Sequence, residues 1–274
     1  MGQTIACANQ KGGVGKTTTV VNLASVLAHE GDRVLVIDLD PQGNATSGLG
    51  LDRAAIERSV YDAVVDGVDL KELVVSVGAT GVDLVPAAIA LAGAEIELAA
   101  LDARERRVRR LLASIADRYD VILIDSPPSL GLLTVNALTA ADAVLIPLQC
   151  EYYALEGLTQ LLATIDLVRD HLNPTLALNG VVLTMSDGRT NLSADVAAEV
   201  RQHLGTAVYD TVIPRSVRLS EAPSHGLPIT TYAPTSRGAA AYRDLAREFR
   251  ARIGRPSAGA PLIPVGDALE AVLS

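Results

Sequence analysis

The amino-acid sequence predicts a single α/β domain built on a mostly parallel, twisted β-sheet with helices on both faces. Short β-branched runs alternate with stretches of helical spacing along most of the chain, which is the pattern of repeated β-α-β units. Hydrophobic residues make up 49% of the 274 residues and aromatic residues only 3%, so the core consists mainly of Ala, Val, Leu and Ile. Such a core suits a parallel sheet that helices bury on both sides. A chain of this length commonly folds as one α/β unit.

The first half of the chain contains clear strand and helix patterns. The apolar run 4–9 predicts a strand, and a glycine-rich turn follows it. Residues 17–31 have apolar side chains at helical spacing and end at a glycine, which predicts a helix. The continuous β-branched run 33–40 predicts a buried strand that ends in carboxylates, and 81–87 is a weaker strand candidate. Residues 106–120 have the amphipathic pattern of a helix.

The second half continues the alternation of strands and helices. Further apolar runs predict strands at 121–129, 142–149 and 176–185. Helical stretches lie near 153–172, 192–204 and 238–253. The chain beyond the last helix is rich in Gly, Pro and Ala. We therefore expect one domain over residues 1–254 and a flexible tail over residues 255–274.

Charge and cysteine content limit the class of protein. The net charge is −9 and the isoelectric point about 4.9, which disfavours non-specific nucleic-acid binding by the chain as a whole. The charge is uneven, because nine Arg stand against six Asp or Glu between residues 189 and 252, a local balance of +3. Cys7 and Cys150 each lie in or beside an apolar run, which favours a reducing compartment. With neither a signal pattern nor a spanning apolar segment, we expect a cytoplasmic protein without membrane contacts.

Residues 9–18, NQKGGVGKTT, nearly match the phosphate-binding pattern G-x-x-x-x-G-K-[ST]. Gln10 stands where the pattern has its first glycine, and Lys11 beside it is one of three lysines in the chain. A glycine-rich loop between a strand and a helix turns backbone N–H groups toward phosphate. Lys16 would reach the β- and γ-phosphates, and the Thr17 hydroxyl would bind Mg²⁺ directly. We expect nucleotide contacts from Lys11, Gly12, Gly13, Val14, Gly15, Lys16, Thr17 and Thr18.

Two further strand ends carry carboxylates. Asp125 closes the strand in VILIDSPP, the position of a Walker-B aspartate, and would hold the Mg²⁺ shell through water. In DLDPQGN, Asp38 would form a hydrogen bond to the glycine-rich loop. It would contact the groups that bind the metal and not the metal itself. Asp40 would either orient the attacking water or serve as a turn residue before Pro41. Ligands of parallel sheets bind beyond the carboxyl ends of the strands, so these segments should converge on one site.

Four motifs resemble one known family. KGGVGKTT, DLDPQGN, DSPPS and IPRSVRLSEAPSHGLPI are similar to the ParA/Soj chromosome-partitioning ATPases of the deviant Walker A class, and the resemblance runs from about residue 3 to 253. It implies a P-loop NTPase fold, with ATP and Mg²⁺ as cofactors and Lys11, Lys16 and Asp40 as catalytic residues. Lys11 would be the signature lysine, which crosses the interface of an ATP-sandwiched homodimer. The ATP-bound dimer would bind double-stranded DNA of the nucleoid non-specifically, and a ParB-type partner would stimulate hydrolysis and release it.

The resemblance also implies a base pocket and a DNA surface. The adenine site maps to Pro214 and Ser216, where relatives commonly have Asn in place of the serine, and Met185 lies near it in the pattern; by itself, Met185 is more simply a core residue. The DNA contacts map to Arg189, Arg218, Arg215, Arg237, Arg243, Arg247 and Arg250. Contacts to phosphates are independent of sequence and sensitive to salt. For the arginines between 243 and 252 the alternative is a solvated helix face.

Three other functions are compatible with the phosphate-binding pattern of residues 9–18. A MinD-like membrane switch needs a basic amphipathic helix at the C-terminus, whereas residues 263–274 contain no Lys or Arg. An electron-transferring iron protein needs cysteines at ligand spacing, and neither Cys7 nor Cys150 has such a partner. A metabolic ligase or small-molecule kinase shares the same phosphate-binding pattern and stays open.

Overall fold

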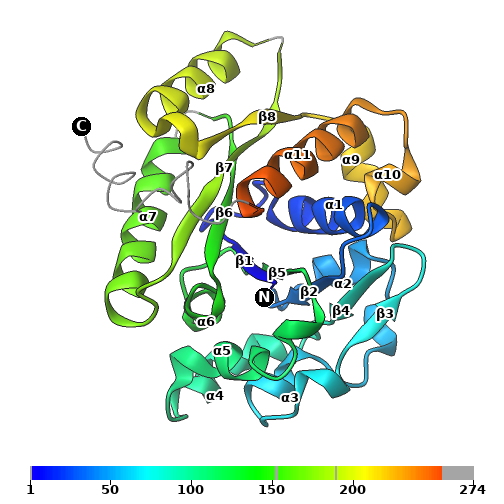
Figure 1. Cartoon of the computed structure of the whole chain (residues 1–274), viewed down its shortest axis with the longest axis vertical. Coiled ribbons are helices and arrows are strands. Elements are labelled where there is room, and N and C mark those ends of the chain that lie inside the picture. The colour runs from blue at the N-terminus through cyan, green and yellow to red at the C-terminus, as the bar shows by residue number, and fades with distance from the viewer. Residues whose placement is uncertain (1, 152–153, 189, 255–274) are drawn as a thin grey trace.

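The structure is a computed structural model that describes residues 2–151, 154–188 and 190–254. Within this part of the chain, eight strands form one sheet in the order β3-β4-β2-β5-β1-β6-β7-β8 (Figure 1). In that order their bounds are Val75–Val77, Val82–Val85, Val34–Asp38, Val121–Asp125, Gln3–Cys7, Ala143–Gln149, Ala177–Ser186 and Val208–Pro214. The pair β3–β4 is antiparallel and the other described pairs are parallel. The predicted α/β fold with a mostly parallel sheet is therefore confirmed.

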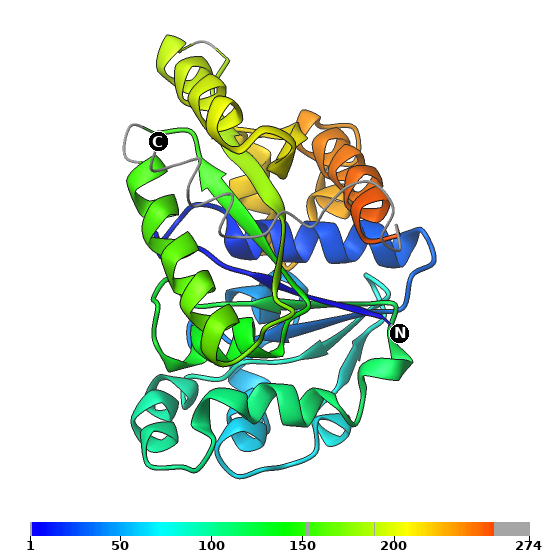
Figure 2. The same ribbon diagram turned by 60° about the vertical axis from the view of Figure 1, so that its left-hand side comes forward.

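Helices cover both faces of the sheet, as Figures 1 and 2 show. One face carries α1 (Lys16–His29), α2 (Asn44–Gly48), α9 (Val217–Glu221), α10 (Ile229–Tyr232) and α11 (Arg237–Ile253). The other carries α3 (Val60–Val64), α4 (Leu91–Ala99), α5 (Arg107–Leu112), α6 (Leu132–Ala140), α7 (Ala154–His171) and α8 (Asn191–Leu204). Successive side chains of a strand point to opposite faces, so Ile5 and Cys7 join one core while Ala6 joins the other. Burial on both faces explains why the strands are apolar throughout.

Strand register brings the predicted carboxylates together. Strands β2 and β5 are neighbours, and their pairing sets Asp38 directly opposite Asp125. Strand β1 pairs with β5 on the other side, which sets Cys7 opposite Asp125 immediately before the glycine-rich loop. The loop and both carboxylates therefore meet at one edge of the sheet, as predicted from the parallel topology.

Most predicted elements exist with shifted ends, and one prediction is wrong. The expected helix over 106–120 is broken into the six-residue α5 and a short 3₁₀ turn at Ala116–Arg118. Between them, the Ser114 hydroxyl donates to the Asp69 carboxylate and to the Leu111 carbonyl. The bond to Leu111 is local and competes with the helical backbone pattern, and the bond to the distant Asp69 holds Ser114 at the break.

Several elements escaped the sequence patterns. Strands β3 and β8 and helices α4 and α6 are present in the structure without having been predicted. Helix α6 shows no amphipathic stripe because its polar residues Thr134, Asn136 and Thr139 are buried along with its apolar ones. Strand β8 lies at the sheet edge, where α11 packs along it. The expected tail over 255–274 lies outside the described residues.

Candidate nucleotide-binding site

The glycine-rich loop joins β1 to α1 and is held by side chains from other strands. Gly13 and Gly15 have φ angles of 75° and 91°, in the left-handed region that favours glycine. The Thr184 hydroxyl at the end of β7 donates to the Val14 carbonyl at 2.8 Å. Asn9 donates through Nδ2 to the Pro147 carbonyl at 2.8 Å and accepts the Lys11 N–H at 3.0 Å. The loop is therefore fixed in place before any ligand binds.

Lys16 lies inside this loop, at the start of α1. The residue is only 6% exposed, and its Nζ donates to the Lys11 carbonyl at 3.2 Å. Burial lowers the pKa of Lys16, and the nearby Asp125 opposes that shift. A buried ammonium with a single carbonyl contact is poorly satisfied, since it can donate three hydrogen bonds. An anion in the loop would supply the missing partners.

Asp125 and Thr17 form the second part of the site. The Thr17 hydroxyl donates to Asp125 Oδ2 at 2.7 Å, while the buried Oδ1 has no hydrogen-bond partner among the residues that the structure describes. Burial, and then the neighbouring Asp38, raise the pKa of Asp125 well above its ordinary range. An unpartnered buried carboxylate oxygen beside a hydroxyl is the kind of oxygen set that a Mg²⁺ shell uses. The residues present therefore fit the expected metal.

Asp38 and Asp40 differ in how fully they are bonded. Asp38 accepts hydrogen bonds from the N–H and hydroxyl of Thr46, at 2.8 and 2.7 Å, and from the Asp40 N–H at 3.1 Å. Burial raises the pKa of Asp38 to about 6. Asp40 accepts the Gln42 N–H at 2.9 Å, as a turn residue before Pro41 would. It also lines the cavity beside the glycine-rich loop, which we call the phosphate cavity. Both roles left open for Asp40 are thus compatible with its position.

Two cavities adjoin the loop. The first, of about 350 Å³, is lined by loop residues including Gly13 and Lys16 together with Asp40 and Pro128. The second, of about 320 Å³, contains Met185, Pro214 and Ser216, the three residues mapped to an adenine site. Gly15, Thr18, Met185 and Pro223 line both cavities. The two adjacent cavities can therefore hold the phosphate chain and the base of one nucleotide.

Met185 is not a core residue, contrary to the simpler interpretation of the sequence. It is half-buried at the junction of the two cavities, and its φ of 50° is left-handed. A non-glycine residue in this region is strained, and such residues concentrate at ligand sites. Ser216 precedes α9, and its side chain makes no capping hydrogen bond, so its hydroxyl is available to a ligand.

Lys11 points to a different partner from Lys16. Its Nζ forms an ion pair with Glu151 Oε2 at 2.6 Å, and the two side chains are 47% and 45% exposed. The neighbouring Gln10 donates to Gln160 Oε1 of α7 at 2.7 Å. The two lysines of one loop therefore face different surroundings, one buried in the loop and the other at the surface.

The predicted DNA arginines fall into distinct environments. Arg189 lies outside the described residues. Arg218 is exposed and pairs with Glu221 at 3.0 Å, and Arg215 and Arg237 line one polar hollow of about 500 Å³. On α11, the exposed Arg247 pairs with Asp244 and Arg243 donates to the Pro234 carbonyl at 3.0 Å.

Arg250 differs from the other arginines because it binds within the molecule. It forms ion pairs with Glu30 and with Asp32, the latter at 2.6 Å, and ties α11 to the end of α1. These contacts make it a poor DNA candidate. Sequence reasoning also missed three site residues: Thr184 and Glu151, which no motif marks, and Pro128, which lies in DSPPS but was given no role.

A glycine-rich loop between β1 and α1, a buried lysine and a threonine–aspartate pair at one edge of a parallel sheet define a P-loop nucleotide-binding protein. Among the described residues, no helix combines the length and apolar character that membrane crossing requires. A family model described as AAA domain matches residues 2–178.

Comparison with known proteins narrows the class. The chain is 59% identical to the sporulation initiation inhibitor protein Soj of Bacillus subtilis, over 92% of this chain and 99% of that protein. It is 52% identical to the chromosome partitioning protein ParA of Caulobacter vibrioides, over 90% and 94%. A solved structure of cobyrinic acid a,c-diamide synthase from Mycobacterium smegmatis, with ATP analog and magnesium, matches at TM-score 0.81 and 40% identity, over 93% and 98%. The chain belongs to the ParA/Soj family of chromosome-partitioning ATPases.

Proposed function

We propose that residues 1–254 form a Mg²⁺-dependent ATP hydrolase that works as a nucleotide-gated dimer switch. The observation that carries this proposal is the division between the two loop lysines. Lys16 is buried in its own loop, where its Nζ donates to the Lys11 carbonyl, while Lys11 lies at the surface and pairs with Glu151. An exposed ion pair contributes at most about 1 kcal/mol, so Lys11 can leave Glu151 readily. It is then free to reach the phosphates of a second copy across an ATP-sandwiched dimer.

The site residues have separate roles in this proposal. The loop from Lys11 to Thr18 binds the phosphates, and Lys16 supplies the buried cation. Thr17 would bind Mg²⁺ directly, Asp125 would act through water, and Asp38 would keep this edge of the sheet in place. Bound Mg²⁺ would neutralise charge that develops between the β- and γ-phosphates. Asp40, which lines the same cavity, orients the attacking water.

The second cavity would hold adenine. Met185 and Pro214 offer apolar contact to the base, and the Ser216 hydroxyl is an available hydrogen-bonding group. This cavity shares Gly15 and Thr18 with the phosphate cavity, so one nucleotide can occupy both. The solved diamide synthase with a bound ATP analog and magnesium supports the assignment of ATP.

The ATP-bound dimer would bind double-stranded DNA of the nucleoid through phosphate contacts. The candidate residues are Arg189, Arg215, Arg218, Arg237, Arg243 and Arg247. A dimer brings two such patches together, which reconciles DNA binding with a net charge of −9. A ParB-type centromere-binding partner would then stimulate hydrolysis and release the dimer from DNA. Binding of this kind weakens steeply as salt rises.

The division of the lysines can be tested with two variants. Lys11→Ala should leave ATP affinity nearly unchanged but abolish the ATP-dependent dimer. Hydrolysis should fall by roughly 10³-fold, the lower range for a cation supplied in trans. Lys16→Ala should instead weaken nucleotide binding itself. Titration with a fluorescent ATP analogue, light scattering and phosphate release measure the three properties. Identical behaviour of the two variants would contradict the division of roles.

A second experiment tests the switch as a whole. The ATPase rate should be measured with neither, either and both of DNA and a peptide from the N-terminus of a ParB-type partner. Synergy between the two supports the proposed function, whereas a flat response contradicts it.

For the DNA surface, Arg218→Ala should reduce ATP-dependent retention of DNA at low salt, and full retention would rule out this arginine as a contact.

A further inference from the structure

Helix α6 begins directly after the loop that follows Asp125, and a side chain from α4 lies at its first turn. Glu95 Oε1 accepts the Leu133 N–H at 3.3 Å. The first N–H groups of a helix have no partners within the helix, and its N-terminus favours negative charge. The Glu95 carboxylate therefore anchors the start of α6.

Gly131 makes room for this carboxylate. An ideal Cβ atom built on Gly131 would overlap the carboxylate and come within 2.8 Å of its carbon atom. The backbone of Gly131 has φ −77° and ψ −171°, which any residue can adopt. A side chain at this position would thus displace the Glu95 carboxylate, whereas the backbone conformation itself sets no demand for glycine.

The anchored segment forms a wall of the nucleotide site. The loop 126–131 is fixed at its start by the Ser126 hydroxyl, which donates to the Cys7 carbonyl at 2.8 Å, and near its middle by the Thr134 hydroxyl, which donates to the Ser129 carbonyl at 2.6 Å. Between these points Pro128 lines the phosphate cavity, with its Cβ 3.7 Å from the position of a Cβ on Gly12. Glu95 holds the far end of the same loop.

We propose that Glu95 is a positioning residue for ATP hydrolysis, which sets the loop 126–131 against the Gly12 side of the phosphate cavity. This inference rests on the proposed ATPase function. Glu95 touches no ligand itself and acts through the start of α6. The groups that bind the nucleotide, above all Lys16 and the loop amides, do not depend on it. The expected defect is therefore in turnover and not in ATP affinity.

Gly131→Ala and Glu95→Ala provide the test. The alanine at 131 meets only the end of a flexible side chain, so it should expel the carboxylate while the protein stays folded. Each variant should lower kcat by roughly 10- to 100-fold, since a misplacement of about 1 Å in an active site can cost about 100-fold. The double variant should be no worse than either single variant, since both remove the same contact. The dissociation constant for ATP should stay within about twofold.

Two further variants separate positioning from general stability. Glu95→Gln keeps an oxygen that accepts the Leu133 N–H, so it should retain most of the turnover. Glu97→Ala removes another α4 carboxylate, one that accepts from the Tyr61 hydroxyl at 2.9 Å, and should leave kcat unchanged. Wild-type turnover in Gly131→Ala, additive losses in the double variant, or parallel losses of kcat and affinity would overturn the inference. A wild-type chain that hydrolyses no ATP would instead overturn the proposed function, and this inference with it.

Discussion

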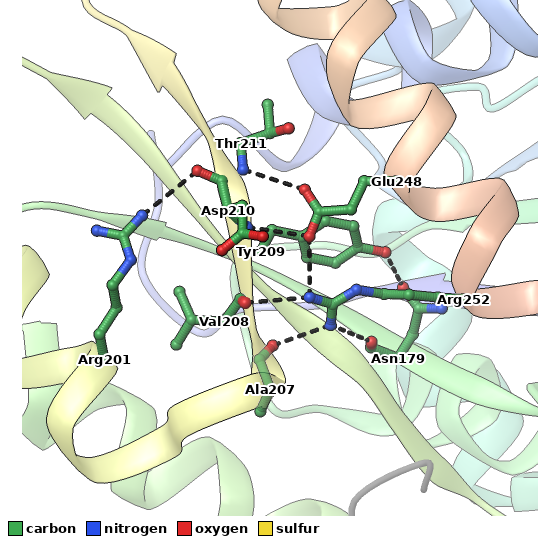
Figure 3. A network of polar contacts seen from close by, with 9 residues as sticks. All are labelled: Asn179, Arg201, Ala207, Val208, Tyr209, Asp210, Thr211, Glu248 and Arg252. Atoms are coloured by element: carbon green, nitrogen blue, oxygen red, sulfur yellow. Dashed lines mark hydrogen bonds and ion pairs between the residues drawn. The ribbon is translucent and has the colours of Figure 1, made fainter. Parts of the chain in front are cut away.

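The nucleotide edge of the sheet and the junction of α11 with β7 and β8 both hold charged groups away from solvent, fully buried at the first and partly buried at the second, and the two places differ in how these groups are bonded. At the nucleotide edge, Asp125 Oδ1 has no partner and Lys16 donates to one carbonyl. At the junction, Figure 3 shows Arg252 surrounded by acceptors. Its guanidinium donates to the carbonyls of Asn179, Ala207 and Val208 at 3.0 to 3.2 Å and to Glu248 at 3.0 Å.

The junction is also closely packed. The Arg252 guanidinium stacks over the Tyr209 ring at 3.8 Å from its centroid, and the Tyr209 hydroxyl donates to Asn179 Oδ1 at 2.6 Å. Glu248 accepts the N–H groups of Asp210 and Thr211, each at 3.0 Å, so that α11 covers unpaired groups of the edge strand β8. Only the Asn179 amide nitrogen in this network lacks a partner among the described residues.

This difference separates the polar groups that stabilise the fold from those that lack hydrogen-bond partners until a ligand binds. A buried charge that is fully bonded stabilises its surroundings relative to a broken network, whereas an unpartnered one lowers stability until something binds. The junction belongs to the first kind and the nucleotide edge to the second. Substitutions at the two places should therefore have opposite consequences for stability and for binding.

The largest effect on stability is expected from Arg252→Ala. Removal of the guanidinium leaves three carbonyls without this donor and Glu248 with only the N–H groups of Asp210 and Thr211, at a cost of about 2–3 kcal/mol in the free energy of unfolding. ATP affinity should be unchanged at a temperature where the variant is folded. Urea denaturation measures the first quantity, with Arg247→Ala on the same helix as the control, because its exposed pair contributes at most about 1 kcal/mol. Equal losses in the two variants would remove the contrast.

Lys16→Ala should behave in the opposite way. The buried ammonium is poorly satisfied without a ligand, so its loss should leave the unfolding free energy nearly the same. The variant should bind ATP about 100-fold more weakly, because a buried charge contact to phosphate is lost. Calorimetric titration and denaturation on the same samples separate the two effects. A large loss of stability with retained affinity would show that Lys16 holds the fold.

The smallest effect is expected from Asp125→Asn. Burial raises the pKa of Asp125, so the charged form destabilises the ligand-free fold, and the variant should be more stable by about 1–2 kcal/mol at a pH where this carboxyl is ionised. A folded-state pKa above the unfolded value means that the folded protein binds the proton more tightly. For the adjacent Asp38, this contribution to stability is full below pH 3.8 and is lost as the pH rises through about 6.

The pH dependence gives the same comparison a second measurement. Wild-type stability relative to Asp125→Asn should improve as the pH falls, since the folded protein takes up the Asp125 proton more readily than the unfolded chain does. Denaturation curves at several pH values would show the difference in unfolding free energy between the wild type and Asp125→Asn becoming smaller. A difference that grows toward low pH would mean that the carboxylate is better hydrogen-bonded than its unpartnered oxygen indicates.

The sequence alone was a good guide to the nucleotide edge. A strand, a glycine-rich loop and a helix are adjacent in the chain, so local patterns predict both their structure and their use. The β-branched runs likewise predicted the central strands, and the parallel topology predicted that Asp38 and Asp125 would meet. The break within 106–120 was not predictable from periodicity, because it depends on a hydroxyl bond from Ser114 to the distant Asp69.

The sequence by itself therefore determined the fold class, the family and the phosphate-binding loop, because each depends on residues that are close together along the chain. The tertiary structure decided the rest. Thr184 holds the loop across 170 positions, Glu95 reaches α6 across 38, and Arg252 closes the edge of β8 from α11. These contacts join side chains with no common motif, and only the packing of helices against the sheet brings them within bonding distance.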